Sequence, residues 1–442
     1  MTSSSDDRSV TRNVGARSVP VIRANPPGAF LSLMLALAAF TTTPPEGPAD
    51  FLRMHFGSYL ITYFDLAVMA AGLWLLFSLR IRIHLNEKKI ILALLFIIAT
   101  RIVSLIVARS MAMGQLLSVF RYVETLVVVI LLANLLGAPR NRKFFLAGVM
   151  LGALTETIGG LAILVMHRGE SRGFWLGIDN YKWQIYLLFV CTLFLFKRKN
   201  IFWTAFTAST LFVGVLATQT RAALVLFCIM ILMALLSRRQ QLLKPILVTS
   251  LLLCLTVISV LRVFPDAEQA LGQRIEELWT GGGVIGWRIV MFEMAIAAYV
   301  QHPIIGIGSG GFARQQNALY LEINDAFSQE YETLYDYTST HNTVLGIAAE
   351  TGTVGLIAYL FWVVTIVRTC VNSLRMESIN RDNFALAACL FMLALMSQDF
   401  WGQASFLASS SCLLGFVLGW RRNHRSEISL TRQVSPVASV TP

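Results

Sequence analysis

The sequence predicts an all-α protein: a polytopic transmembrane bundle of about 12 spans, with one long extracytoplasmic loop that contains an amphipathic helix. Of the 442 residues, 56% are hydrophobic and 14% are charged, whereas ordinary soluble domains are about 25% charged. Several apolar stretches reach about 20 residues, the length of a helix that crosses the hydrocarbon core of a bilayer. These observations exclude a soluble enzyme and a disordered chain, and the lack of short alternating runs disfavours an outer-membrane barrel.

The apolar stretches give the expected spans in order. The first, 29–44, has a short apolar core like that of a signal peptide, but the long polar segment before it favours a retained helix. The remaining predicted spans are 59–79, 90–108, 114–137, 144–166, 182–196, 201–218, 221–237, 245–263, 341–367, 383–399 and 403–420.

The positive charges predict the orientation of these spans. The net charge is +11, and 24 of the 36 Lys and Arg residues fall in both tails and the even-numbered loops, whereas 10 fall in the odd-numbered loops. The positive-inside rule therefore places both termini in the cytoplasm, and the basic balance needs no nucleic-acid partner. The six cysteines lie in or beside apolar runs without a CxxC pair, so they predict no metal site. The predicted regions are a disordered cytoplasmic tail 1–28, spans one to nine in 29–263, an extracytoplasmic loop 264–340, spans ten to twelve in 341–420, and a cytoplasmic tail 421–442.

The long outer loop is unusual in its charge. Residues 264–340 hold ten Asp and Glu residues against three arginines, within a protein that is basic as a whole. Residues 287–300 have apolar side chains at helical spacing, which predicts an amphipathic helix at the membrane surface. A loop of this length with ordered structure is usually functional.

Ionisable residues inside predicted spans are costly and are therefore candidates for function. Arg101 has no acid at helical spacing on its own span, which favours a role in a site, whereas Arg121 and Glu124 lie three residues apart and can simply neutralise each other. Counted from the predicted span ends, Arg101, Arg121, Asp65 and Glu350 gather in the outer half of the bilayer. The full set is Asp65, Arg101, Arg121, Glu124, Glu156 and Glu350.

Three outer-face positions carry side chains suited to group transfer. Arg221 opens a predicted span and Arg288 lies on the predicted amphipathic helix, and a guanidinium group binds phosphate with two parallel hydrogen bonds. His341 opens the span after the loop, and imidazole changes its protonation state near neutral pH, as a general base requires. Each residue also has a structural interpretation: an arginine snorkelling at a helix end, or a histidine that only starts a helix. The glycines 306 and 308 lack a nucleotide-binding context and predict a turn that returns the chain to the membrane.

Together these residues resemble the signature of the O-antigen ligase/polymerase superfamily. The shared pattern is Arg288…Pro303-x-x-Gly306-x-Gly308-x-x-x-Phe312…His341-Asn342-x-x-Leu345-x-x-x-x-Glu350-x-Gly352-x-x-Gly355. Thr220-Arg221 is similar to the family's Ser-Arg pair, with threonine in place of serine. Gly177 to Asn180 is similar to the family's G-x-x-N segment, without the usual proline.

The resemblance implies a metal-independent, inverting glycosyltransferase of the bacterial inner membrane, without a cofactor. The donor would be a glycan on undecaprenyl diphosphate, taken from the outer face of that membrane. The acceptor would be lipid A-core in a ligase, or another lipid-linked glycan in a polymerase of O-antigen or exopolysaccharide. Arg221 and Arg288 would hold the diphosphate and His341 would act on the acceptor hydroxyl, with Arg101, Arg121, Asn180 and Glu350 as possible accessory residues. The chain has no DxD motif for a metal, so arginines must neutralise the leaving diphosphate.

Two other classes of protein fit the composition. A transporter of lipid-linked sugars or small molecules would also have about twelve spans, but such carriers often consist of two similar halves with a site at the midplane. Here the largest outer loop follows the ninth span and the charges lie near one face. A scaffold protein of the envelope would not need six ionisable residues inside its spans.

Overall fold

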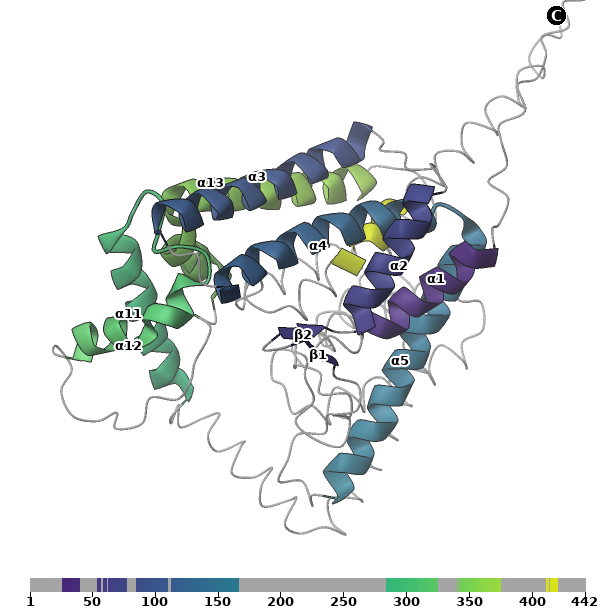
Figure 1. The fold of residues 1–442 in the computed structure, drawn as a ribbon, viewed down its shortest axis with the longest axis horizontal. Helices are drawn as coiled ribbons and strands as arrows, with labels where there is room; N and C mark the ends of the chain where they lie inside the picture. The colour runs from purple at the N-terminus through teal and green to yellow at the C-terminus, as the bar shows by residue number, and fades with distance from the viewer. Residues whose placement is uncertain are drawn as a thin grey trace, which may run out of the picture.

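A computed structural model gives the architecture of the helical part of the chain (Figure 1). The elements described are helices, apart from one short hairpin in which Met54–Phe56 (β1) pairs antiparallel with Tyr59–Ile61 (β2). The residues described are 26–39, 54–56, 59–61, 63–77, 85–109, 113–166, 284–324, 340, 342–374, 411–412 and 414–419.

The described residues up to Met166 form five helices. They are α1 (Pro26–Ala38), α2 (Tyr63–Phe77), α3 (Leu85–Val107), α4 (Met113–Leu135) and α5 (Pro139–Met166). Each overlaps one of the first five predicted spans. Helices α1 and α5 both begin at proline, which has no amide hydrogen to leave unsatisfied in a first turn. The second span is corrected at its start, because residues 59–61 form a strand and the helix begins at Tyr63.

Small residues allow these helices to approach closely. A Cβ atom at Gly148 of α5 would lie 2.8 Å from the carbonyl oxygen of Leu33 in α1, so only glycine fits there. Gly415, in the helical residues 414–419, is packed in the same way against Leu132 of α4, since its Cβ would lie 2.5 Å from that of Leu132. Close contact at small residues is typical of helices that associate within a membrane.

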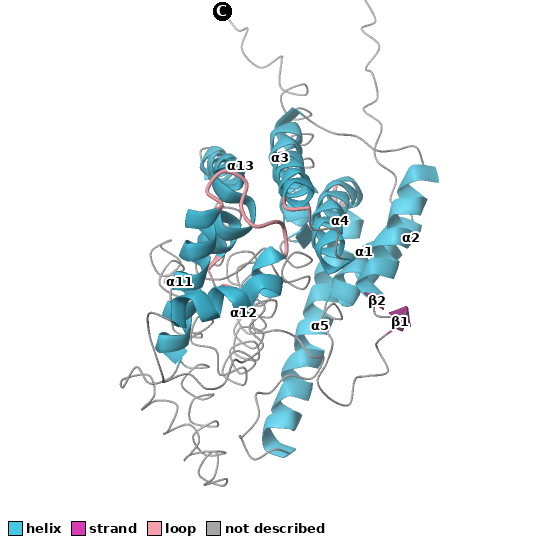
Figure 2. Cartoon of the chain, turned by 60° about the vertical axis from the view of Figure 1, so that its left-hand side comes forward, coloured by secondary structure: helices cyan, strands magenta, loops and turns pink. Residues whose placement is uncertain are grey.

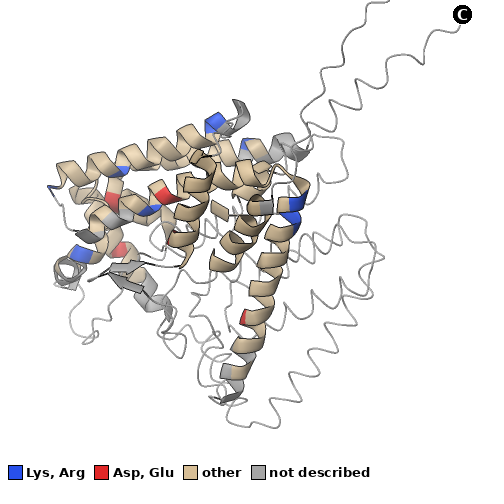
Figure 3. Ribbon diagram, turned by 45° about the vertical axis from the view of Figure 1, so that its right-hand side comes forward, with Lys and Arg blue, Asp and Glu red and all other residues tan. Residues whose placement is uncertain are grey.

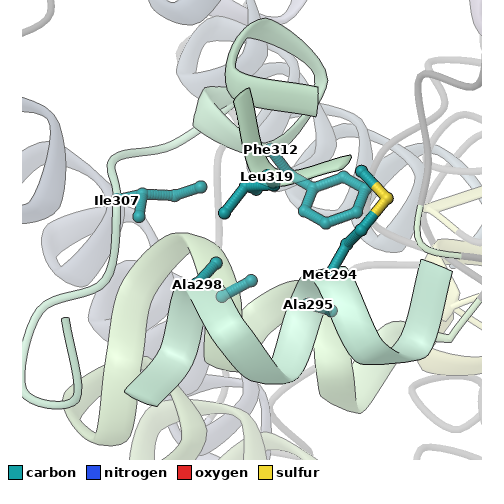
Figure 4. Close-up of a cluster of buried hydrophobic side chains, with 7 residues drawn as sticks. Met294, Ala295, Ala298, Ile307, Phe312 and Leu319 are labelled. Atoms are coloured by element: carbon teal, nitrogen blue, oxygen red, sulfur yellow. The ribbon is translucent and has the colours of Figure 1, made fainter. Parts of the chain in front are cut away.

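The described part of the predicted outer loop forms two helices, α11 (Val284–Gln301) and α12 (Gly311–Asn324). Helix α11 confirms the helix expected over residues 287–300, while α12 was not expected. Figure 4 shows Phe312 and Leu319 of α12 pointing toward Met294, Ala295 and Ala298 of α11. Ile307, from the connection between the two helices, closes this buried apolar cluster, which also includes Ala349 of the following helix. The cluster therefore ties α11, α12 and their connection to the next helix.

Helix α13 (Thr343–Leu374) is long but broken. Gly352 has φ 63° and ψ −159°, so the helix is interrupted there and resumes after it. Helix α13 packs beside α3 (Figure 1), and the contacts Arg101–Glu350 and Phe96–Phe361 show that the two run antiparallel. Within the described residues, Lys88–Val107 of α3 and Thr343–Ile366 of α13 are each long and apolar enough to cross a membrane. Figure 3 shows how sparse the charged positions are along the described helices.

Several predictions fall elsewhere in the chain. The spans expected at 182–196, 201–218, 221–237, 245–263 and 383–399 lie outside the described residues. The structure therefore confirms a helical protein and the positions of about half the predicted helices, while the total of about 12 spans stays a prediction.

Candidate functional site

The start of α13 shows what the asparagine of the His341-Asn342 pair does. The Oδ1 atom of Asn342 accepts hydrogen bonds from the backbone amides of Val344 (3.0 Å) and Leu345 (3.2 Å). Asn342 is thus the N-cap of α13, satisfying amides that have no partner within the helix. Thr340 supports the cap by donating its hydroxyl to the carbonyl oxygen of Asn342 at 2.9 Å. In the sequence, His341 directly precedes this capping residue.

The connection between α11 and α12 lies against the break in α13, and Figure 2 shows this loop beside that helix. Before the break in sequence, the amide of Ile307 donates to the carbonyl oxygen of Ala349 (2.9 Å), and the amide of Gly308 donates to the carbonyl oxygen of Glu350 (3.0 Å). The two carbonyl groups that α13 gives up at its break are therefore satisfied by the loop.

The loop also satisfies the amides that follow the break. The amide of Thr353 donates to the carbonyl oxygen of Pro303 (2.8 Å), and that of Val354 donates to Ile304 (3.2 Å). The Thr353 hydroxyl also donates to Pro303, at 2.8 Å. Because an apolar membrane offers no water to such groups, a broken span needs a partner of this kind. A turn is present at these glycines, as expected, but it leads into α12 and does not return the chain directly to the next predicted span.

The signature glycines allow this contact. Gly306 has φ 75°, and a Cβ atom there would lie 2.3 Å from the carbonyl carbon of Glu350. Gly352 has φ 63°, and its Cβ would lie 2.4 Å from the carbonyl carbon of Ile304. A residue with a side chain would thus meet both an unfavourable backbone conformation and a steric clash with backbone.

Arg101 of α3 contacts both the loop and α13 near this break. Its Nη1 atom donates to Oε2 of Glu350 at 2.8 Å and to Oγ of Ser309 at 2.8 Å. Its guanidinium group lies over the ring of Tyr122 of α4, 4.3 Å from the ring centre. Ser104, one turn further along α3, donates its hydroxyl to the carbonyl oxygen of Glu350 at 2.6 Å. Arg101 is only 4% exposed, and its charge is balanced by the Glu350 carboxylate.

A second polar cluster lies between α2 and α4. Arg121 forms ion pairs with Asp65 and with Glu124, the latter at 2.7 Å. The pairing of Arg121 with Glu124 is thus present, as the spacing of three residues allowed, and Asp65 of α2 adds a second carboxylate. Two carboxylates therefore share one arginine in this cluster.

The remaining predicted site residues are placed less fully. Arg288 lies in the early turns of α11, and its backbone is described. Asn180, Arg221 and His341 lie outside the described residues, although Asn342 fixes the chain directly after His341. The structure brings together two accessory candidates, Arg101 and Glu350, which are 249 residues apart in sequence.

Three contributing residues were not expected from the sequence. Ser104, Tyr122 and Ser309 each contact Arg101 or Glu350. Ser104 carries a usable signal, because it lies three residues after Arg101 and therefore on the same helix face. Tyr122 and Ser309 carry none, since their roles depend on which helices pack together.

These features define a class of protein: an integral membrane protein of helices, with buried ion pairs between helices and a helical segment, residues 284–324, anchored to a broken helix. Residues 206–360 match the family model described as O-antigen ligase, which confirms the resemblance to the O-antigen ligase/polymerase superfamily. The matched range contains Arg221, Arg288, His341 and Glu350, whereas Arg101, Arg121 and Asn180 precede it. A comparison with curated proteins gives no match.

Proposed function

We propose that the protein is a membrane glycosyltransferase that moves a glycan from undecaprenyl diphosphate to an acceptor at the outer face of the bacterial inner membrane. The observation that carries this proposal is the match of residues 206–360 to the O-antigen ligase family. That range includes Arg221, Arg288 and His341, the three residues at predicted outer-face positions that are suited to group transfer. The acceptor is lipid A-core if the protein is a ligase, or a second lipid-linked glycan if it is a polymerase.

The proposed reaction is a direct displacement at the anomeric carbon of the donor. A hydroxyl oxygen of the acceptor forms the new glycosidic bond while the bond from the anomeric carbon to the diphosphate oxygen breaks, which inverts the configuration. His341 accepts the proton of the attacking hydroxyl. The undecaprenyl diphosphate leaves as an anion, and Arg221 and Arg288 neutralise the charge that develops on it. No metal is needed in this scheme, because the two guanidinium groups supply the positive charge.

Two features of the structure support this assignment. The Asn342 cap fixes the first turn of α13, and the proposed base, His341, directly precedes this cap in the sequence. The apolar cluster of α11, α12 and Ala349 fixes the helix that carries Arg288 to the same helix, α13. The helix that carries the proposed diphosphate ligand and the helix that follows the proposed base in the sequence therefore pack together.

Transfer by the purified protein tests the proposal. The protein is incubated with a defined polyprenyl-diphosphate glycan and either lipid A-core or a second molecule of the donor. A glycosylated lipid A-core identifies a ligase, and a longer lipid-linked glycan identifies a polymerase. If neither product forms while the donor crosses the bilayer of proteoliposomes, the protein is a transporter and the proposal is wrong.

A further inference from the structure

The helical segment 284–324 contacts α3 and α13 at a buried polar junction formed by the loop 303–309, Arg101 and Glu350. The loop 303–309 exchanges backbone hydrogen bonds with both sides of the break at Gly352, and Arg101 binds both partners of this contact. The Nη1 atom of Arg101 donates to both Ser309 on the loop and Glu350 on α13. The guanidinium also lies over Tyr122 of α4, so four segments of the fold meet at this side chain.

The environment of Arg101 disfavours direct contact with a substrate. The residue is 4% exposed, and the carboxylate of Glu350 lies 2.8 Å from it. A diphosphate would have to displace this carboxylate or share the cation with it, which would bring like charges together in a medium of low dielectric constant. Removing one partner of such a buried pair is usually costly, because the other charge is left without compensation.

The position of the junction suggests what Arg101 does. Helix α11, which carries Arg288, ends where the loop begins, and the first half of α13, which follows His341, ends at the break that the loop covers. The relative position of these two helices therefore depends on how the loop sits against the break.

We propose that Arg101 is a positioning residue: through Ser309 and Glu350 it fixes the loop 303–309 against the broken helix, and so sets Arg288 relative to His341. This inference rests on the proposed function and assigns to Glu350 and Ser309 the role of partners of Arg101. The glycines at 306 and 352 contribute to the same arrangement, because they allow the loop and the broken helix to approach closely.

Kinetics of two conservative variants separate positioning from substrate binding. In Arg101→Gln and Ser309→Ala, kcat is expected to fall by about tenfold or more, with the donor KM within about twofold of its original value. A contact of Arg101 with the diphosphate would instead raise the donor KM, and that result would overturn the proposal. Unchanged turnover per folded molecule in both variants would also overturn it, since Arg101 would then serve stability alone. Arg314→Gln, which removes an exposed arginine of α12, is the matched control and should keep full activity.

An exchange of the two charges gives an independent test. Arg101→Glu and Glu350→Arg should each lower activity by about 100-fold or more, and the double variant should recover at least tenfold over either. A glutamate at position 101 cannot bind a diphosphate, so recovery in the double variant would show that residue 101 acts through its pairing with residue 350. A double variant without recovery would contradict the positioning role. The thermal midpoints of the four proteins in detergent are measured in parallel. If no protein, including the original, transfers glycan, the proposed function fails, while recovery of the midpoint in the double variant still establishes the pairing.

Discussion

At the residue scale, the proposed mechanism depends on the fork geometry of two arginines. Arg221→Ala and Arg288→Ala are expected to lower glycan transfer by at least about 100-fold, and lysine at either position should restore only part of it. Lysine provides one point charge and cannot form the two parallel hydrogen bonds that guanidinium makes with phosphate. The measurement is initial rate at saturating donor, with Arg314→Ala as the exposed-arginine control. Full activity in either alanine variant would remove that arginine from the site.

His341 carries the second residue-scale prediction. His341→Ala should lower turnover by about 10² to 10⁴-fold, the usual contribution of general acid–base catalysis. A base must be neutral to accept a proton, so the rate should fall as the pH is lowered through the range in which imidazole becomes protonated. Turnover is measured against pH with the donor at saturating concentration. If the alanine variant keeps the turnover and pH profile of the original protein, His341 only precedes the Asn342 cap.

The buried charges show what sequence can and cannot predict at this scale. The pair Arg121–Glu124 follows from a spacing of three residues on one helix. The partner of Arg101 does not, because Glu350 lies 249 residues away and the two meet only when α3 packs against α13. The sequence favours a site role for Arg101 because no acid lies at helical spacing from it, whereas the fold gives Arg101 a distant partner, Glu350.

At the scale of elements, the break in α13 is a feature that the sequence did not predict. Residues 341–367 form one predominantly apolar stretch that includes glycines at 352 and 355, and such a pattern is compatible with an unbroken span. The break becomes understandable only with the loop 303–309 in place, since the loop satisfies the backbone groups that the helix loses. The helix over residues 287–300 was predictable, because its apolar periodicity is local.

Substitution at the break tests this account. Gly352→Ala should lower stability by more than about 2 kcal/mol, because its φ and ψ lie in a region that is essentially restricted to glycine. Its Cβ would also contact the backbone of Ile304 at 2.4 Å. Gly72→Ala in α2 is the control, since its Cβ would come no closer than 4.0 Å to Leu131. Thermal unfolding in detergent gives both values, and equal midpoints for the two variants would show that the break is not required.

At the scale of the whole molecule, the directions of the helices agree with the predicted topology. Helix α1 runs parallel to α5, since Gly28 lies near Asn141 and Gly148 near Leu33. Residues 414–419 run parallel to α4, because Gly415 meets Leu132 and Gly419 meets Leu136. Helices α3 and α13 are antiparallel. Alternating spans numbered one, three, four, five, ten and twelve require these same directions, which hydropathy and charge predicted without any contact information.

Orientation in the membrane is tested by labelling with a thiol reagent that does not cross membranes. In a cysteine-free background, Gln315→Cys, an exposed position on α12, should react in intact cells. A cysteine introduced at Ser3 in the N-terminal tail should react only after the cells are permeabilised. The reverse pattern would invert the predicted topology and would move the proposed site to the cytoplasmic face.

The central claim is that this protein forms a glycosidic bond, and analysis of both reaction products tests it most directly. Purified protein in detergent micelles, where no compartments exist for transport, is given a polyprenyl-diphosphate glycan of known anomeric configuration together with an acceptor. The account predicts one released undecaprenyl diphosphate for each new glycosidic bond, with the anomeric configuration inverted, and the same rate in the presence of a metal chelator. Loss of activity with the chelator, retention of configuration, or the absence of any bond under conditions in which the protein is folded and binds donor would contradict it.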